Sequence, residues 1–199
     1  MIAENEVLGI REMEGNEQDL GIFLKWMTDP ETMKYWEGMT KHYDYEMVLE
    51  EYQEAQKEQV AQCLILYGQK PIGYCQFCVL DARSYEVPQE EYDRYVSPGG
   101  LVYGIDMFLG ETEYRDRGIG SESLKLLCGA LFSKYHADVI LIDPKVHNAR
   151  AIGCYHKSGF RDYFVVPQRE EQDGILHDSL IMGLRRVRTL HFAEPESHR

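Results

Sequence analysis

The chain has 199 residues, of which 44% are hydrophobic and 12% aromatic, and this composition excludes a disordered or fibrous protein. Its length fits one domain with a substantial core. The net charge of −13 argues against a nucleic-acid-binding surface and is compatible with a cationic small substrate, although acidity also simply keeps a protein in solution. No apolar run is long enough to span a membrane, and the N-terminus lacks the basic and apolar regions of a signal peptide, so we expect a cytoplasmic protein.

The first segment predicts a strand, two helices and a loop. Residues 7–11 read as a strand, and Asn16 can cap a helix that Pro30 terminates. The apolar face of this helix is formed by Leu20, Phe23, Leu24 and Met27. Asp44 can cap a second helix. The loop between the helices carries Trp36, whose ring fits either the edge of the core or a platform for a sugar ring.

A hairpin and a long loop follow. Residues 61–67 and 72–80 predict two antiparallel strands across a glycine-containing turn. Gln76 is a polar residue among apolar ones and faces either a cavity or solvent. The pattern then dissolves over residues 81–100, for which we expect an acidic, tyrosine-bearing loop that is functional or mobile.

A candidate anion site follows the next strand. Residues 101–110 predict a largely buried strand with one carboxylate, Asp106. An R-x-x-G-x-G motif ends at Gly120, and a helical pattern starts at Ser121. Glycines let a ligand approach the backbone, and a helix N-terminus attracts anions, so the arrangement suits a pyrophosphate. The spacing also fits an ordinary tight turn, and it matches neither the dinucleotide fingerprint nor a P-loop.

The last segment predicts a buried parallel strand, a helix and two closing strands. The strands are expected at 139–142, 160–166 and 178–184, and the helix at 148–157. A turn is expected near Gly174. We therefore expect one domain over residues 1–184 and a polar, basic tail over 185–199.

The five cysteines predict buried free thiols in a reducing compartment. Cys75 and Cys78 resemble a metal or redox pair, but positions three apart in a strand face opposite sides of a sheet. We therefore expect no metal site.

A second block, Asn148-Ala-Arg-Ala-Ile-Gly-Cys-Tyr155-His-Lys-Ser-Gly159-Phe160, follows the first. The order strand, R-x-x-G-x-G, helix, strand and N-x-R-A-x-x-x-Y-x-K-x-G-F resembles the GCN5-related N-acetyltransferase (GNAT) superfamily, whose members bind acetyl-coenzyme A (acetyl-CoA). The resemblance implies an α/β fold, with a mixed, centrally splayed sheet of about six to seven strands and flanking helices. We expect a monomer or a homodimer with no nucleic-acid or membrane partner.

Within that superfamily the chain is most similar to aminoglycoside 6'-N-acetyltransferases. Beyond the two motifs, the similarity rests on Leu24-Lys-Trp-Met-Thr-Asp29, Pro71-Ile-Gly-Tyr-x-Gln76, Val102-Tyr-Gly-Ile-Asp106 and Ile142-Asp-Pro144. It implies antibiotic resistance through acetylation of the 6'-amine of a polycationic aminoglycoside, by direct transfer in a ternary complex. Acetyl-CoA would be the co-substrate, with no metal.

Carried over residue by residue, the resemblance implies three groups of site residues. The residues implied in binding acetyl-CoA are Met107, Phe108, Leu109, Arg115, Arg117, Gly118, Ile119, Gly120, Ser121, Asn148, Ala151, Tyr155 and Lys157. The residues implied in binding the amine are Trp36, Gln76, Asp106, Asp143 and Asp178. The implied catalytic residues are Asp106 and Tyr155.

Several roles have alternatives. Asp106 is either the base that removes a proton from the ammonium group or only its binding partner. Tyr155 either returns a proton to the leaving thiolate or packs its helix on the sheet. Asp143 could be a turn residue before proline, and Asp178 is equally compatible with a structural role. Other functions left open are acetylation of a siderophore hydroxylamine or a protein N-terminus, and a non-catalytic coenzyme A-binding module.

Overall fold

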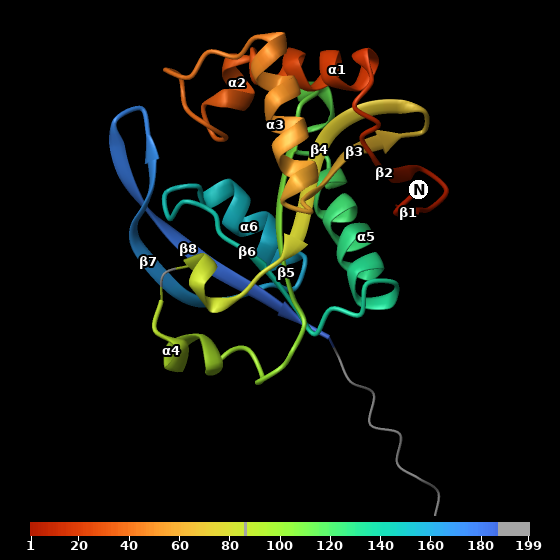
Figure 1. Ribbon diagram of the computed structural model, residues 1–199. Helices are drawn as coiled ribbons and strands as arrows, with labels where there is room; N and C mark the ends of the chain where they lie inside the picture. Colours follow the sequence, from red (N-terminus) through yellow and green to blue (C-terminus); the bar gives the residue numbers. More distant parts are fainter. Residues whose placement is uncertain (86, 187–199) are drawn as a thin grey trace, which may run out of the picture.

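A computed structural model describes residues 1–85 and 87–186, and within them eight strands form one sheet in the order β1-β2-β3-β4-β5-β6-β8-β7 (Figure 1). The strands are β1 (Ala3–Glu4), β2 (Leu8–Glu12), β3 (Ala61–Tyr67), β4 (Lys70–Val79), β5 (Val102–Leu109), β6 (Val139–Ile142), β7 (Arg161–Gln172) and β8 (Ile175–Arg185). The mixed α/β fold is confirmed. The strand that the sequence pattern did not indicate is β1, which is only two residues long.

Six helices flank this sheet in the described part of the chain. They are α1 (Glu17–Met27), α2 (Pro30–Met33), α3 (Tyr45–Lys57), α4 (Gln89–Asp93), α5 (Ile119–Ser133) and α6 (Ala149–Lys157). Four of the helices begin at side-chain caps: Asn16 accepts from the Asp19 N–H, Asp29 from the Thr32 N–H, Asp44 from the Met47 N–H, and Asn148 from the Ala151 N–H. The two caps predicted for the early helices are therefore confirmed.

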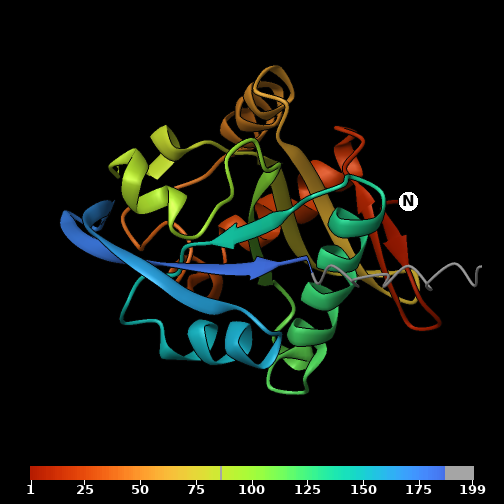
Figure 2. The ribbon, with the colours of Figure 1, turned by 90° about the horizontal axis from the view of Figure 1, so that it is seen from below.

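The helices cover both faces of the sheet. Figure 2 shows α5 and α6 on one face and α3 and α4 on the other. The alternation of β3 explains this, since Ile65 packs with the α5 residue Leu127, whereas Leu64 packs with the α1 residue Phe23. A strand that is buried on both faces must be apolar at nearly every position, as β3 is.

The sheet is splayed between β5 and β6. The two strands pair in parallel over only three residues, from Val102 with Val139 to Gly104 with Leu141. On its other side β5 pairs with β4 as far as Leu109. Because β6 ends at Ile142 and Pro144 lacks an N–H for a ladder, no strand of the described residues pairs with the edge of β5 beyond Gly104 on this side.

The expected loop at 81–100 contains two short elements, a 3₁₀ turn at Ala82–Tyr85 and helix α4. Buried Tyr85 and Tyr92 pack against sheet residues that include Val139 and Ile181. The element boundaries also differ at two other places. Helix α5 begins at Ile119 rather than Ser121, and β7 and β8 extend through polar residues that carry no strand pattern.

The closing hairpin turns at Asp173 and Gly174, as the sequence predicts. Both residues have positive φ, 54° and 77°, which is the geometry of the tight hairpin turn that favours Asp-Gly. Strand β8 ends at Arg185, and residues 187–199 of the expected tail lie outside the described part of the chain.

Candidate active site

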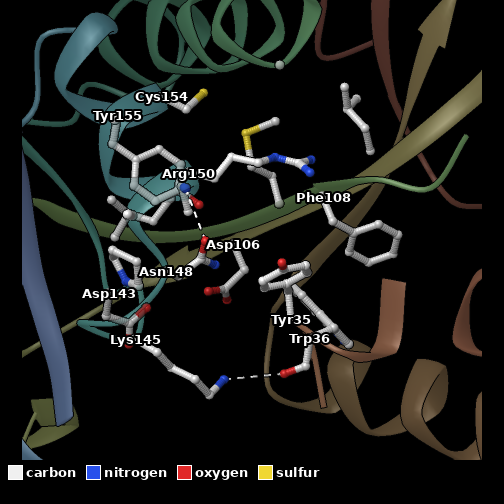
Figure 3. Close-up of a pocket in the computed structure, with 18 of the residues that line it drawn as sticks. Tyr35, Trp36, Asp106, Phe108, Asp143, Lys145, Asn148, Arg150, Cys154 and Tyr155 are labelled. Carbon is white, nitrogen blue, oxygen red and sulfur yellow. Dashed lines mark hydrogen bonds between the residues drawn. The ribbon is translucent and has the colours of Figure 1, made fainter. Parts of the chain in front are cut away.

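A cavity of about 980 Å³ opens where β5 and β6 separate (Figure 3). On β5, Met107 and Leu109 pack with the α5 core, whereas Phe108 packs on the opposite face with the α1 core. Asp106 shares the face of Phe108, because side chains two apart in a strand point the same way. The splay therefore joins the two faces of the sheet into one continuous cavity.

One end of the cavity is built from helix N-termini. Gly118, with φ of 80°, precedes α5, and Asn148 caps α6. Gly118, Gly120 and Ser121 line this end. The first turn of a helix leaves backbone N–H groups without intrahelical partners, so this end suits an anion.

The arginines and Ile119 of the motif lie differently. Arg117 does not line the cavity and instead donates to the Glu113 carbonyl, 3.2 Å away. Ile119 packs its side chain into the core. Arg115 lines the cavity, but its guanidinium also donates to the Leu109 carbonyl at 2.9 Å and to Thr32 Oγ1 at 3.0 Å. Arg115 thus ties the end of β5 to α2.

The remaining residues predicted to hold the cofactor do line the cavity. They are Met107, Phe108, Leu109, Asn148, Ala151, Tyr155 and Lys157. The side-chain oxygen of Asn148 also caps α6, because it accepts a hydrogen bond from the Ala151 nitrogen 3.1 Å away. Tyr155 is buried, and burial raises the pKa of its phenol, so the group stays protonated at neutral pH and remains a donor.

Asp106 points into the middle of the cavity, between Asp143 and Asn148 on one side and Tyr35 and Trp36 on the other (Figure 3). Burial, with a further contribution from the charge of Asp143, raises the pKa of Asp106 to about 7. Its oxygen Oδ2 accepts a hydrogen bond from Gln76 Nε2 at 2.9 Å. A carboxylate with a pKa near neutrality can accept a proton and release it again.

The other end of the cavity carries paired charges. Asp143 forms an ion pair with Arg169, and Glu170 forms one with Lys145 at 2.8 Å. Burial raises the pKa of Asp143 and outweighs the effect of Arg169. Burial also acts to raise the pKa of Glu170, but the hydrogen bond and charge of Lys145 outweigh it, and that pKa is lowered.

The structure brings four of the five predicted amine-binding residues together. Trp36, Gln76, Asp106 and Asp143 line the cavity, whereas Asp178 does not. The Asp178 carboxylate instead accepts the Gln168 N–H at 2.9 Å. Trp36 lines the cavity and also packs edge-on against Phe108 with ring centroids 4.9 Å apart, so its place at the edge of the core is confirmed and its role as a sugar platform stays a prediction.

Sequence reasoning missed several residues that line the cavity. These include Glu31, Tyr35, Glu37, Arg83, Lys145, Arg150, Cys154, Arg169 and Glu170. Arg150 and Cys154 lie within the second motif block and could have been found there. Arg169 and Glu170 lie on the polar extension of β7, where no motif marks them.

The cysteines are free thiols in the structure. Cys75 is buried in the core with Cys63, and Cys78 is half-buried. Within residues 1–85 and 87–186, no group of three His, Cys, Asp or Glu side chains is placed to hold a metal ion. None of the helices described is long and apolar enough to cross a membrane.

Residues 16–166 match the family described as the acetyltransferase (GNAT) domain, so the chain belongs to the GNAT acetyltransferases. Among its relatives is aminoglycoside N(6')-acetyltransferase type 1 of Klebsiella pneumoniae, 30% identical over 146 residues that cover 72% of this chain and 70% of the relative. Similar solved structures include AAC(6')-Ib with ribostamycin and coenzyme A, at 24% identity and a TM-score of 0.73, covering 91% of this chain and 94% of that one. AAC(6')-Ib with coenzyme A and kanamycin is 25% identical with a TM-score of 0.71, over 90% of this chain and 95% of that one.

Proposed function

We propose that this protein transfers an acetyl group from acetyl-CoA to the 6'-amine of an aminoglycoside, by direct attack in a ternary complex. The observation that carries the proposal is the position of Asp106, halfway along a cavity whose ends differ in chemistry. One end offers helix N-termini, which suit the phosphates of a nucleotide cofactor, and the other offers carboxylates and Trp36, which suit an amino sugar. The names of the relatives support the same substrate and cofactor.

The residues at the cofactor end fit acetyl-CoA. A Cβ added at Gly120 would meet nothing of the protein closer than Leu109 Cδ1 at 3.8 Å, so its backbone is open to a ligand. The free edge of β5 at Met107–Leu109 could pair with the amide groups of the pantetheine arm, as an added strand would. We infer that the first turn of α5 holds the pyrophosphate. When bound, acetyl-CoA supplies the thioester carbon that the amine attacks.

Two residues of the chain, Asp106 and Tyr155, carry out the proton transfers. An ammonium group has no lone pair, so Asp106 first takes one proton from it, and its pKa of about 7 suits this transfer at neutral pH. Tyr155 is a protonated donor on α6 that lines the same cavity, and its phenol can give a proton to the departing thiolate. As the C–N bond forms and the C–S bond breaks, the attacking nitrogen gives up a second proton, which restores the Tyr155 phenol. The products are then the N-acetylated sugar and free coenzyme A, with the first proton passing from Asp106 to solvent.

The test is thiol release from acetyl-CoA with kanamycin as the amine. An otherwise similar aminoglycoside with a 6'-hydroxyl should bind and release no thiol, because it lacks the nucleophile. Affinity for kanamycin should weaken as salt is raised, because the charge attraction is partly screened.

Thiol release with a polyamine or a peptide N-terminus, and none with kanamycin, would show that the substrate is another amine. No release with any amine would favour a non-catalytic coenzyme A-binding module. Cytoplasmic location and oligomeric state stay predictions.

A further inference from the structure

A row of polar side chains crosses three neighbouring strands and ends at the cavity. Gln62 of β3 is the cross-strand partner of Gln76 of β4, which is in turn the partner of Asp106 of β5. Cross-strand partners point to the same face of a sheet. Tyr74 lies two residues before Gln76 on β4 and therefore shares that face. We call Gln62, Tyr74, Gln76 and Asp106 the polar row.

The hydrogen bonds of the polar row run in one direction. The Tyr74 hydroxyl donates to Gln76 Oε1 at 2.7 Å, and Gln76 Nε2 donates to Asp106 Oδ2 at 2.9 Å. Because the Gln76 oxygen is occupied by Tyr74, its amino group must face Asp106. Burial raises the pKa of Tyr74 well above its ordinary value, and the buried side chain of Gln62 acts in the opposite direction. Because Gln62 lies on the face that Tyr74 and Gln76 share, an amino group directed at the phenol oxygen would favour the orientation in which the Tyr74 proton faces Gln76.

Burying the side chain of Gln62 lowers the stability of the fold unless its amide forms hydrogen bonds. Its side chain is only 7% exposed and Tyr74 only 1%. Within the described chain, the Gln62 oxygen is a buried atom with no hydrogen-bond partner. A buried carbonyl without a partner destabilises a fold, and leucine would fill similar space without this defect. The amino group of this amide, on the face that Tyr74 also occupies, is the part that would orient Tyr74.

We propose that Gln62 and Tyr74 are positioning residues that act through Gln76 to fix one oxygen of Asp106 and leave the other free for the proton of the amine. The role of Asp106 in this statement rests on the proposed function. Without the Tyr74 hydroxyl, the Gln76 amide can turn over and present its oxygen to Asp106. The carboxylate would then lose its only donor in the polar row, and its charged form would be less stable.

Other charged and titratable groups also act on Asp106 or feel its charge. They are Asp143 at the end of β6, Arg169 and Glu170 of β7, Tyr155 of α6, Cys78 of β4 and Tyr85 of the 3₁₀ turn. All of them remain in the variants proposed below. A change in the pKa of Asp106 in these variants can therefore be attributed to the altered hydrogen bonds of the polar row.

The first test needs no substrate. The pKa of Asp106 is measured by carbon-13 NMR of the protein labelled at aspartate carboxyls, with Asp106→Asn identifying the resonance. Tyr74→Phe should raise the midpoint by about one pH unit, the effect of one hydrogen bond, and Gln62→Leu should raise it by less. Tyr92→Phe is the matched control, because Tyr92 is also buried and its hydroxyl has no partner in the described chain. Its midpoint should equal that of the wild type.

The variants keep the packing around the polar row. Phenylalanine at position 74 retains the ring contacts of Tyr74 with Phe23 and Phe108, whose centroids lie 4.7 Å and 5.5 Å away. Gln62→Leu removes the unpartnered oxygen, so its melting temperature should equal or exceed that of the wild type. A purely structural role for Gln62 would not combine unchanged stability with a shifted Asp106 titration.

The second test follows kcat/KM for kanamycin against pH. In Tyr74→Phe and Gln62→Leu the acidic limb should move upward with the NMR midpoint, whereas the KM for acetyl-CoA should stay unchanged. Midpoints and profiles that coincide with those of the wild type and Tyr92→Phe would overturn the proposal. Failure of the proposed function looks different, since the NMR midpoints would still shift while no aminoglycoside releases thiol.

Discussion

Arg169 forms an ion pair with Asp143 inside the cavity, although the two residues are 26 positions apart in the sequence. Lys145 pairs with Glu170 in the same way, at 2.8 Å. Asp106 has no such cation within ion-pair distance in the described part of the chain and is bonded instead to the neutral amide of Gln76. In the resting cavity, Asp106 is therefore open to a substrate ammonium group, whereas Asp143 becomes available only if Arg169 moves.

Arg169→Gln should increase the affinity for kanamycin. The change removes the internal competitor for Asp143, and we expect KM to fall by about three- to tenfold, or roughly 0.7–1.4 kcal/mol. The substrate-free protein should be less stable, because the change leaves a partly buried carboxylate without its partner. Arg161→Gln, at an exposed position of β7, is the control and should change neither quantity. An unchanged or raised KM in Arg169→Gln would show that Asp143 does not bind the substrate.

Asp106→Asn should lower kcat by about 10²–10⁴, because the amide keeps the shape of the carboxylate but cannot take a proton. In the wild type, kcat/KM should rise as the pH passes through the pKa of about 7, since only the deprotonated form is a base. The variant should lose this rise of kcat/KM with pH. Full turnover with only a raised KM would make Asp106 a binding residue.

The same substitution should stabilise the fold above neutral pH. The pKa of Asp106 is about 7 in the folded protein, whereas an unfolded aspartate has a pKa near 3.9. The folded state therefore binds the proton more tightly, and this group's contribution to stability falls as pH rises from about 4 to 7. At pH 8 Asp106→Asn should be more stable than the wild type by about 1–3 kcal/mol, with the gap closing toward pH 4. Urea unfolding at both pH values measures this difference in unfolding free energy. A difference that does not change with pH would contradict the prediction.

The two glycines before and within α5 should behave differently. Gly118 has a φ of 80°, so Gly118→Ala should destabilise the fold by about 1 kcal/mol through backbone strain. A Cβ at Gly120 has ordinary room, with Cys154 Sγ at 3.9 Å, so Gly120→Ala should melt like the wild type. Calorimetry should nevertheless show weaker acetyl-CoA binding for Gly120→Ala, because the methyl group projects where the pyrophosphate approaches. Unaltered binding would remove Gly120 from the cofactor site.

Several features of the fold and the site could be predicted from the sequence because their causes are local. The caps Asn16 and Asp44 act within three residues, and the turn at Gly174 needs only the backbone freedom of its own residues. The position of Asp106 inside an apolar strand was likewise visible. The two elements within residues 81–100 could not be predicted in this way, because elements of four or five residues are too short to show a period.

Pairing between distant side chains could be decided only by the tertiary structure. Periodicity tells which face a residue takes but not which residue of another element meets it there. For this reason Asp178 looked equivalent to Asp143, yet one bonds a backbone N–H of β7 and the other lines the cavity. The sequence by itself determined the strand, the glycine turn and the carboxylate of this site, because each depends on neighbouring residues. The sheet register decided the polar row behind Asp106, because its members lie on separate strands. The ion pair of Asp143 likewise depended on the tertiary structure, because Arg169 comes from a distant part of the chain.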